Sequence, residues 1–238
     1  MGNQAFIIRL LGTLGNAYRH MNDYGQAIAC QERSLKLACE SGDRRGEMAA
    51  VNNLGLVYKA QRQTDKAIAM EELALDLARE LEDRAVEIQV LKNLGNAHYA
   101  LGQIDRALFY YQERLAVVRG LGDRRTELQI LKTLSNAFYS MGDMDQANDQ
   151  AQARLQLAKD LHDLSAQEQT LNSLATLQLA AGNLEGARTY SQQRLVVATA
   201  LKDPEMVDEI LALLNSSCYA MGDYGQANDY QRQRLKAS

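Results

Sequence analysis

Hydrophobic residues recur along the chain with two nested spacings. Within each stretch of about 18 residues they fall at intervals of three and four, as Ile88, Leu91, Leu94 and Leu101 do. That spacing is typical of a helix with one buried face, and strand-like alternation is absent. The stretches themselves recur every 40 residues in two alternating kinds. The pattern therefore predicts a series of helix pairs.

The ends of the helices can be placed from the residues between them. Asp83 is a favourable N-cap, and Gly102 stands where glycine commonly terminates a helix. The first helices of the six pairs are expected at residues 4–21, 44–61, 84–101, 124–141, 164–181 and 204–221. The second helices are expected at residues 24–41, 64–81, 104–121, 144–161, 184–201 and 224–236. Connections of two or three residues make neighbouring helices antiparallel.

Small residues recur at two fixed sites of the repeat. One site holds Gly15, Gly55, Gly95, Ser135 and Ala175, and the other holds the series from Ala27 to Ala227. Small side chains allow the two helices of a pair to approach closely, so we interpret both sites as packing sites. A repeating chain forms one continuous object. We therefore expect a single array over residues 1–238, with repeats at about 3–42, 43–82, 83–122, 123–162, 163–202 and 203–238.

The repeated residues resemble the tetratricopeptide repeat (TPR) family, in which a large residue, Leu-Gly, Tyr and Ala follow in order. Leu11, Leu14, Gly15, Tyr18 and Ala27 carry this pattern in the first repeat, and the theme recurs six times. The resemblance implies an all-α, right-handed superhelical solenoid of six helix pairs, or twelve antiparallel helices. The period of 40 rather than 34 looks like the long-repeat arrays of the Pins/LGN-type spindle-orientation scaffolds and of many bacterial TPR proteins.

The resemblance also implies a concave groove lined by the first helices, which would hold an extended peptide. Lys92 with Asn96, and Lys132 with Asn136, match positions of the family's carboxylate-clamp members, whereas Gln129 and Thr133 stand where a basic pair would be expected. Asparagine offers both a donor and an acceptor to a peptide backbone, and lysine attracts carboxylates. The candidate peptide-binding residues are Asn16, Asn52, Lys59, Gln89, Lys92, Asn93, Asn96, Tyr99, Gln129, Lys132, Asn136, Tyr139 and Asn172. A solvated helix face is the alternative.

Other residue types are better explained by structure than by chemistry. Arg114, Arg154, Arg194 and Arg234 form an arginine ladder on the second helices. Because arginine is rarely buried alone, we expect these side chains to pair with residues of the Glu127 type in the next repeat, with ligand contact as the alternative. His98 stands where other repeats have tyrosine, so we interpret it as a core residue. We predict no catalytic or metal-binding residues and no cofactor.

Composition narrows the class of protein further. The 238 residues carry a formal net charge of −4, which does not favour nucleic-acid binding, and no run is long and apolar enough for membrane insertion. Three cysteines without metal spacing favour free thiols and a reducing, cytoplasmic location. We also expect either a longer parent protein or self-association through the array ends, because Ile7 and Ile8 stand where later repeats are more polar.

These observations predict a protein-interaction scaffold rather than an enzyme. The favoured function is binding of an extended, acidic peptide segment of another protein in the groove, centred on the third and fourth repeats. Two alternatives remain open: a regulatory or sensor array within a larger signalling protein, and a structural spacer that associates with itself.

Overall fold

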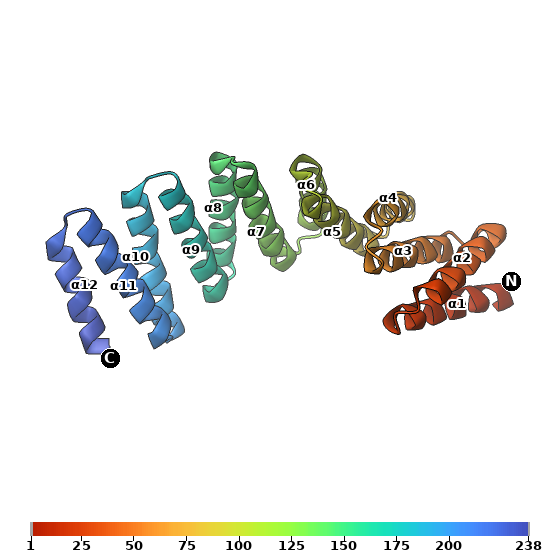
Figure 1. The fold of residues 1–238 in the computed structure, drawn as a ribbon, viewed down its shortest axis with the longest axis horizontal. Coiled ribbons are helices and arrows are strands. Elements are labelled where there is room, and N and C mark those ends of the chain that lie inside the picture. The colour runs from red at the N-terminus through yellow and green to blue at the C-terminus, as the bar shows by residue number, and fades with distance from the viewer. Residues whose placement is uncertain (1, 238) are drawn as a thin grey trace. The chain divides into compact units, whose positions relative to one another are not determined.

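The computed structural model describes residues 2–237 and contains only helices in that range (Figure 1). The twelve helices of the described chain alternate between the first and second kind. The first helices are α1 (Gly2–His20), α3 (Arg44–Ala60), α5 (Arg84–Ala100), α7 (Arg124–Met141), α9 (Leu164–Ala180) and α11 (Pro204–Ala220). The second helices are α2 (Tyr24–Ser41), α4 (Thr64–Glu80), α6 (Ile104–Gly120), α8 (Met144–Asp160), α10 (Leu184–Leu201) and α12 (Tyr224–Ala237). All-α architecture and six helix pairs are thereby confirmed.

The capping residues explain why the helix bounds were predictable. The Asp83 carboxylate accepts a hydrogen bond from the backbone N–H of Val86 at 3.1 Å, which satisfies one of the donors that a helix start leaves free. Asp43, Asp123 and Asp163 cap α3, α7 and α9 in the same way. Because these caps recur with the repeat, helix starts recur with it too.

One residue with positive φ lies in each connection, and these residues recur every 20 positions. Six are glycines, among them Gly102 at +73° and Gly142 at +87°. The others include Glu82 and His162, both at φ +54°. A side chain raises the free energy of this left-handed conformation, so these two connections are more strained than those with glycine.

We expect His162→Gly to raise the free energy of unfolding by about 0.5–1 kcal/mol, because glycine relieves the left-handed strain by more than it adds to the entropy of the unfolded chain. Urea denaturation followed by circular dichroism measures the change. His162→Ala is the control, since it removes the imidazole but keeps a Cβ. Equal stabilisation by both variants would show that the imidazole, rather than the backbone conformation, is responsible.

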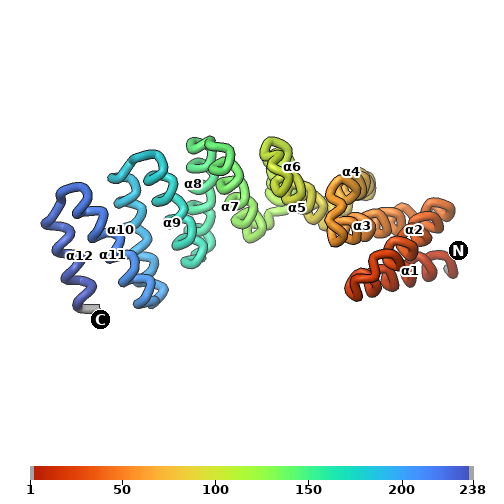
Figure 2. Tube along the Cα trace, viewed as in Figure 1, coloured from red at the N-terminus to blue at the C-terminus, as the bar shows by residue number. Residues whose placement is uncertain are grey.

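The chain divides into two compact units, which we call the N-terminal half (residues 2–121) and the C-terminal half (residues 122–237). Each half contains three helix pairs, and Figure 2 shows the chain reversing direction from one helix of a pair to the next. Within a half, each second helix also packs against the next first helix, as α2 does on α3 and α8 on α9. The single array over residues 1–238 and its right-handed superhelix stay predictions.

The core of each half follows the repeat. Val51, Leu91 and Leu94 from first helices pack with Leu75 and Ala78 of α4 in one buried cluster of the N-terminal half. The repeating alanines are buried as expected, with exposed fractions from 0% at Ala27, Ala107, Ala147 and Ala227 to 5% at Ala187. Burial of these small residues confirms that they mark the close contact of the two helices in a pair.

The small site on the first helix is matched to a residue 16 positions later on the second helix. A Cβ added to Gly95 would collide with the ring of Tyr111, and one added to Gly55 would lie 3.2 Å from Cγ of Glu71. In the fourth repeat the corresponding pair is Ser135 and Ala151, so the larger residue has changed sides. The volume of the pair, rather than the identity of either residue, is what the helix contact restricts.

Candidate functional site

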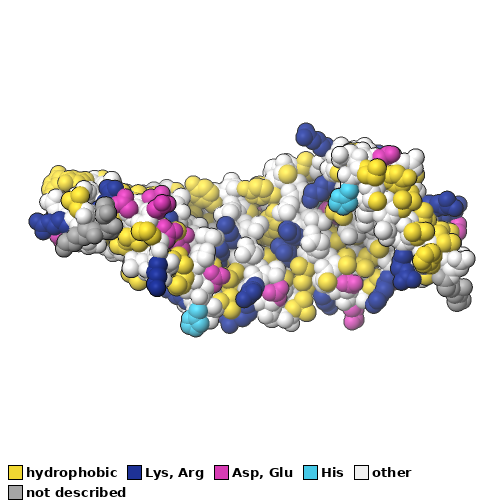
Figure 3. Space-filling model, turned by 90° about the horizontal axis from the view of Figure 1, so that it is seen from below, with side chains coloured by type: hydrophobic (Ala, Val, Ile, Leu, Met, Phe, Trp, Pro, Cys, Tyr) yellow, Lys and Arg dark blue, Asp and Glu magenta, His cyan; other side chains and the backbone are white. Residues whose placement is uncertain are grey.

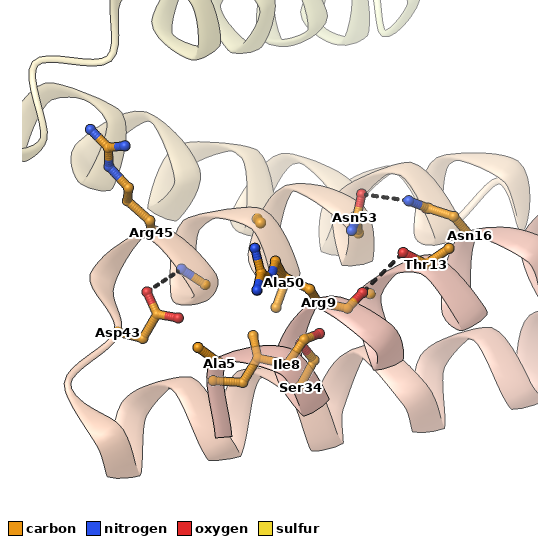
Figure 4. Close-up of a pocket in the computed structure, with 13 residues that line it drawn as sticks. Ala5, Ile8, Arg9, Thr13, Asn16, Ser34, Asp43, Arg45, Ala50 and Asn53 are labelled. Atoms are coloured by element: carbon orange, nitrogen blue, oxygen red, sulfur yellow. Dashed lines mark hydrogen bonds between the residues drawn. The ribbon is translucent and has the colours of Figure 1, made fainter. Parts of the chain in front are cut away.

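In the N-terminal half, the first helices α1 and α3 border a pocket of about 590 Å³ (Figure 4). Arg9 and Thr13 of α1 and Asn53 of α3 line it, Ser34 of α2 lies at its floor, and Arg45 of α3 lies at its edge with its side chain pointing away from the others. The hydroxyl of Ser34 donates to the carbonyl of Ile8, so the floor is held by a hydrogen bond. This pocket offers polar side chains from two neighbouring repeats to one ligand.

A chain of amide hydrogen bonds supports the same pocket. Asn16 Nδ2 donates to Asn53 Oδ1 at 3.4 Å, and Asn53 Nδ2 donates to Gln31 Oε1 at 3.4 Å. The Gln31 side chain is fully buried and donates in turn to the carbonyl of Gly12 at 3.0 Å. The predicted groove residue Asn16 is therefore half-buried and held in place by its neighbours.

Between α3 and α5 the structure corrects one predicted contact. Asn93 is only 5% exposed, because its side chain is directed toward α4, the second helix of the preceding repeat, where it interacts with Glu71. Its Oδ1 accepts a hydrogen bond from Gln89 at 3.2 Å. The side chain is therefore buried beside Glu71 and is not exposed on the surface of α5. Asn52, the predicted contact on α3, is half-buried.

Glu71 is a buried carboxyl group beneath this surface. It is 1% exposed, and within the described chain its Oε1 has no hydrogen-bond partner. Burial raises the pKa of Glu71 to about 7, and the charge of Lys59 and the amide of Asn93 oppose that shift. The predicted groove residue Lys59 therefore lies close enough to influence Glu71 electrostatically.

The remaining predicted residues of the N-terminal half are exposed on α5. They are Gln89, Lys92, Asn96 and Tyr99. Asn96 is oriented from below, since the Tyr111 hydroxyl donates to its Oδ1 at 2.9 Å. That bond leaves the amide N–H groups of Asn96 available to a ligand.

In the C-terminal half, four of the five predicted residues lie near one hollow between α7 and α9. Asn136, Tyr139 and Asn172 line this hollow, which has a volume of about 190 Å³, and Lys132 lies beside Asn136 at an adjoining smaller cavity. Gln129 is exposed on the same helix α7 but lines neither cavity. Thr176, a further polar residue of the fifth repeat, also lines the hollow, and the contributions of Ser135 and Ser173 were not predicted from the sequence. Serine and threonine are common on helix surfaces, so their presence in the sequence does not indicate a binding site.

Arg154 of α8 forms the floor of the smaller cavity and is 3% exposed. Its Nη1 donates to the hydroxyl of Thr170 at 2.6 Å, and its Nη2 donates to Oε1 of Gln169 at 3.2 Å. Both acceptors are neutral, and Nε has no partner within the described residues. Burial lowers the pKa of Arg154, and the more distant charge of Asp163 raises it. The guanidinium nevertheless stays charged, so positive charge lies beneath the surface next to the hollow.

Two further arginines of the ladder, Arg194 and Arg234, are paired with carboxylates as expected, but their partners differ from the expected ones. Arg194 Nε donates to Glu168 at 2.6 Å, and Arg234 makes two hydrogen bonds with Asp208 at 2.8 and 2.9 Å. Both carboxylates belong to the first helix of the same repeat, rather than to a residue of the Glu127 type in the next one. An arginine side chain is long enough to reach a carboxylate of its own repeat or one of the next repeat. Sequence spacing alone could therefore not distinguish these two pairings.

His98 is confirmed as a core residue. It is 1% exposed, its ring stacks on Tyr110 with 5.3 Å between ring centroids, and its Nδ1 lies 2.7 Å from Oε1 of Gln103. Within residues 2–237 no three His, Cys, Asp or Glu side chains are arranged to hold a metal ion. Cys30 and Cys218 are buried, whereas Cys39 is exposed.

Charges of both signs are interspersed over the face shown in Figure 3. No broad field of one sign covers this face. None of the helices described has an apolar run long enough to cross a bilayer.

Helix pairs that recur every 40 residues and pack on their neighbours within each half define a helical-repeat protein of the solenoid class. The model of the family described as "Tetratricopeptide repeat" matches residues 6–80 and 47–120. The same 40-residue period and the same helix pairs continue to the end of the described chain. Residues 6–120 therefore consist of tetratricopeptide repeats, and the rest of the described chain has the same helix-pair fold.

Solved structures with the same fold are distant in sequence. The chain is 16% identical, with a TM-score of 0.71, to a Signal Transduction ATPase with Numerous Domains protein with a tetratricopeptide repeat sensor from Pyrococcus horikoshii. That match covers 98% of this chain but only 36% of the other. BtubC from P. vanneervenii is 18% identical, with 90% of each chain covered and a TM-score of 0.59.

A third structure is a Rap protein complexed with Competence and Sporulation Factor. It is 16% identical over 97% of this chain and 64% of the other, with a TM-score of 0.54. No curated protein matches the chain in sequence. At sequence identities of 16–18%, these similarities support a shared fold and nothing further.

Proposed function

We propose that the exposed faces of the first helices bind an extended segment of a partner protein, and that the hollow between α7 and α9 takes an acidic side chain of that segment. A protein-interaction or sensor role is what the TPR family and the fold support. The observation that carries the finer proposal is the grouping of Lys132, Asn136 and Asn172 above the buried Arg154.

The electrostatic argument rests on Arg154. A buried guanidinium is normally paired with a carboxylate, and even the half-buried Arg194 and Arg234 of the next two repeats have such a partner. Arg154 instead bonds to a hydroxyl and an amide, so its charge is solvated but not neutralised. A carboxylate placed in the neighbouring hollow would gain from this charge and from Lys132. Both interactions favour Asp or Glu over Asn or Gln at that point of the ligand.

The neutral groups around the hollow suit the backbone of an extended peptide. Asn136 and Asn172 each offer a donor and an acceptor, and Tyr139 offers an exposed ring on which a side chain can pack. Such groups bind a main chain with little demand on its sequence. The acidic side chain would then supply most of the specificity.

We expect Lys132→Glu to weaken binding of an acidic peptide by at least tenfold, or about 1.4 kcal/mol, because attraction becomes repulsion. The probe is a peptide selected against the purified protein from a random display library, which we expect to be enriched in Asp or Glu. Fluorescence anisotropy of that peptide and of its Asn or Gln version measures the preference. Lys159→Glu is the matched control, since it makes the same charge change at an exposed position of α8 outside the hollow.

The melting temperature should stay the same in both variants, because both lysines are exposed. A library enriched in basic or purely apolar peptides would contradict the acidic preference. Equal loss of affinity in the two variants would move the site away from the hollow.

A further inference from the structure

The pocket between α1 and α3 has a counterpart in the C-terminal half that is almost closed. The smaller cavity between α7 and α9 is bounded by the same positions of the repeat, but its volume is about 10 Å³ against about 590 Å³. Five lining residues correspond in the two places, namely Gly12, Asn16, Ser34, Ala50 and Asn53 in the first and Lys132, Asn136, Arg154, Thr170 and Ser173 in the second. The same junction is thus open in one half and filled in the other.

Two positions between a second helix and the following first helix account for much of this difference. Ser34 of α2 and Ala50 of α3 occupy them at the open junction, and both side chains are small. At the filled junction they are Arg154 and Thr170, which are joined by a hydrogen bond of 2.6 Å. The other junctions have larger pairs as well, namely Ala74 with Val90, Arg114 with Ile130 and Arg194 with Ile210. Because protein interiors are closely packed, two small residues at this place leave space. The cause of the space therefore lies between α2 and α3.

The lining of the pocket combines an apolar wall with polar groups that already have partners. Ala5, Ile8 and Ala50 supply the apolar wall, and Ile8 is only 3% exposed. The side chains of Asn16 and Asn53 are hydrogen-bonded to each other, so they hold their places without a ligand. A volume of about 590 Å³ with an apolar wall and few polar groups is typical of sites for small ligands.

Arg9 is the cationic group that reaches into this pocket. Figure 4 shows its guanidinium among the lining side chains, whereas Arg45 points away. Within the described part of the chain, the Arg9 side chain has no carboxylate or other hydrogen-bond acceptor as a partner. Asp43 also lines the pocket, but its carboxylate caps α3 by accepting from the backbone N–H of Gly46 at 2.9 Å. A guanidinium with free N–H groups suits a carboxylate, which it can bind through two parallel hydrogen bonds.

We propose that this pocket is a second binding site of the protein, which takes a ligand with a compact apolar body and one carboxylate. The apolar body lies against Ile8 and Ala50, and the carboxylate binds the guanidinium of Arg9. A free organic acid and an apolar side chain beside an acidic residue of a partner segment share this chemistry. The pocket and the hollow between α7 and α9 belong to different halves, so this proposal does not rest on the peptide proposed for the hollow.

The probe is N-acetylphenylalanine, and its neutral amide shows what the carboxylate contributes. Each compound is titrated into the full chain with isotope-labelled isoleucine methyl groups, and the methyl signals are followed by NMR. We expect the acid to shift the Ile8 signal saturably and to leave that of Ile130, which is buried in the C-terminal half, unchanged. The amide should bind at least about fivefold more weakly, because it makes no ion pair.

Two variants separate the contributions of volume and charge. Ala50→Ile fills the pocket with the residue that α7 and α11 carry at this position, and it should weaken binding of both compounds by at least about tenfold. Arg9→Gln keeps the space and should remove the preference for the acid. Arg33→Gln is the matched control, since Arg33 is exposed on α2 and does not line the pocket. Because Arg9 is exposed, its variant should keep the melting temperature and tests the proposal even where Ala50→Ile lowers it.

A peptide blocked at both ends, with an internal Asp-Phe pair, distinguishes the two sources of the ligand. Binding at least about tenfold tighter than that of the acid, and lost in Ala50→Ile, would assign the pocket to a partner segment. Weaker binding than that of the acid would assign it to a free organic acid. Three results would overturn the proposal: no saturable shift of Ile8 with the acid, equal affinity for the acid and the amide, or equal affinity of the parent protein and Ala50→Ile for the acid.

Discussion

Replacing Gly95 by serine is expected to lower the free energy of unfolding by about 2 kcal/mol, and the same replacement is expected to cost less in a protein that already carries Tyr111→Ala. A Cβ at Gly95 would collide with the ring of Tyr111, and overpacking of this kind costs about 1–3 kcal/mol. The better helix propensity of serine offsets only a few tenths of that cost.

The double variant, Gly95→Ser with Tyr111→Ala, has the same two residues as the next repeat, where Ser135 and Ala151 occupy the corresponding positions. Tyr111→Ala alone should cost about 3–5 kcal/mol, because it leaves a cavity and removes the hydrogen bond to Asn96. If the pair is restricted by its joint volume, the double variant should be more stable than the sum of the single effects by about 1 kcal/mol or more.

Urea denaturation of the four proteins followed by circular dichroism gives the coupling. Gly120→Ser is the control, because no atom lies within 4 Å of a Cβ at that position and its helix is otherwise similar. We expect it to change stability by less than about 0.5 kcal/mol. Strict additivity of the Gly95 and Tyr111 substitutions would contradict the matched-volume interpretation.

Glu71→Gln is expected to stabilise the protein at pH 8 by about 2–3 kcal/mol and to have little effect at pH 4. Burial raises the pKa of Glu71 from 4.5 to about 7 in the folded protein. Between those values the folded state binds a proton that the unfolded state has lost. The contribution of Glu71 to stability is therefore fully present below about pH 4.5 and is lost as the pH rises through about 7.

Glutamine has nearly the same shape but stays neutral, so its variant should lack this part of the pH dependence. Thermal unfolding of both proteins from pH 4 to pH 8 measures the difference, and Asp76→Asn on the exposed side of α4 is the control. Parallel curves for wild type and Glu71→Gln would show that Glu71 is ionised in the folded protein at neutral pH.

The helices were predictable because their determinants are local and repeated. Asp83 caps α5, small residues such as Gly95 mark the helix contact, and each recurs every 40 residues. The predicted bounds therefore differ from the observed ones by no more than two residues. His98 could also be placed in the core, because the repeat puts it where other copies have tyrosine.

The candidate site was harder to predict because it depends on contacts between repeats. Asn93 and Asn96 are three residues apart on the same helix, and both have the residue type expected of a groove. Asn93 is buried because it points toward Glu71 of the preceding repeat, whereas Asn96 is exposed and held by Tyr111. Arg154 was recognised as part of the arginine ladder, but its burial beside a hollow depends on Thr170, which lies on a different helix.

The central proposal is that an acidic segment binds in the hollow between α7 and α9, and crosslinking tests it most directly. A photoreactive phenylalanine analogue would replace Tyr139, which lines the hollow, or Val196, an exposed residue of the second helix α10. The library-selected acidic peptide is then irradiated with each protein, and the crosslinked fraction is measured by mass spectrometry. We predict crosslinking from position 139 that excess unlabelled peptide abolishes, and none from position 196. Crosslinking from position 196 with none from position 139 would contradict the proposal.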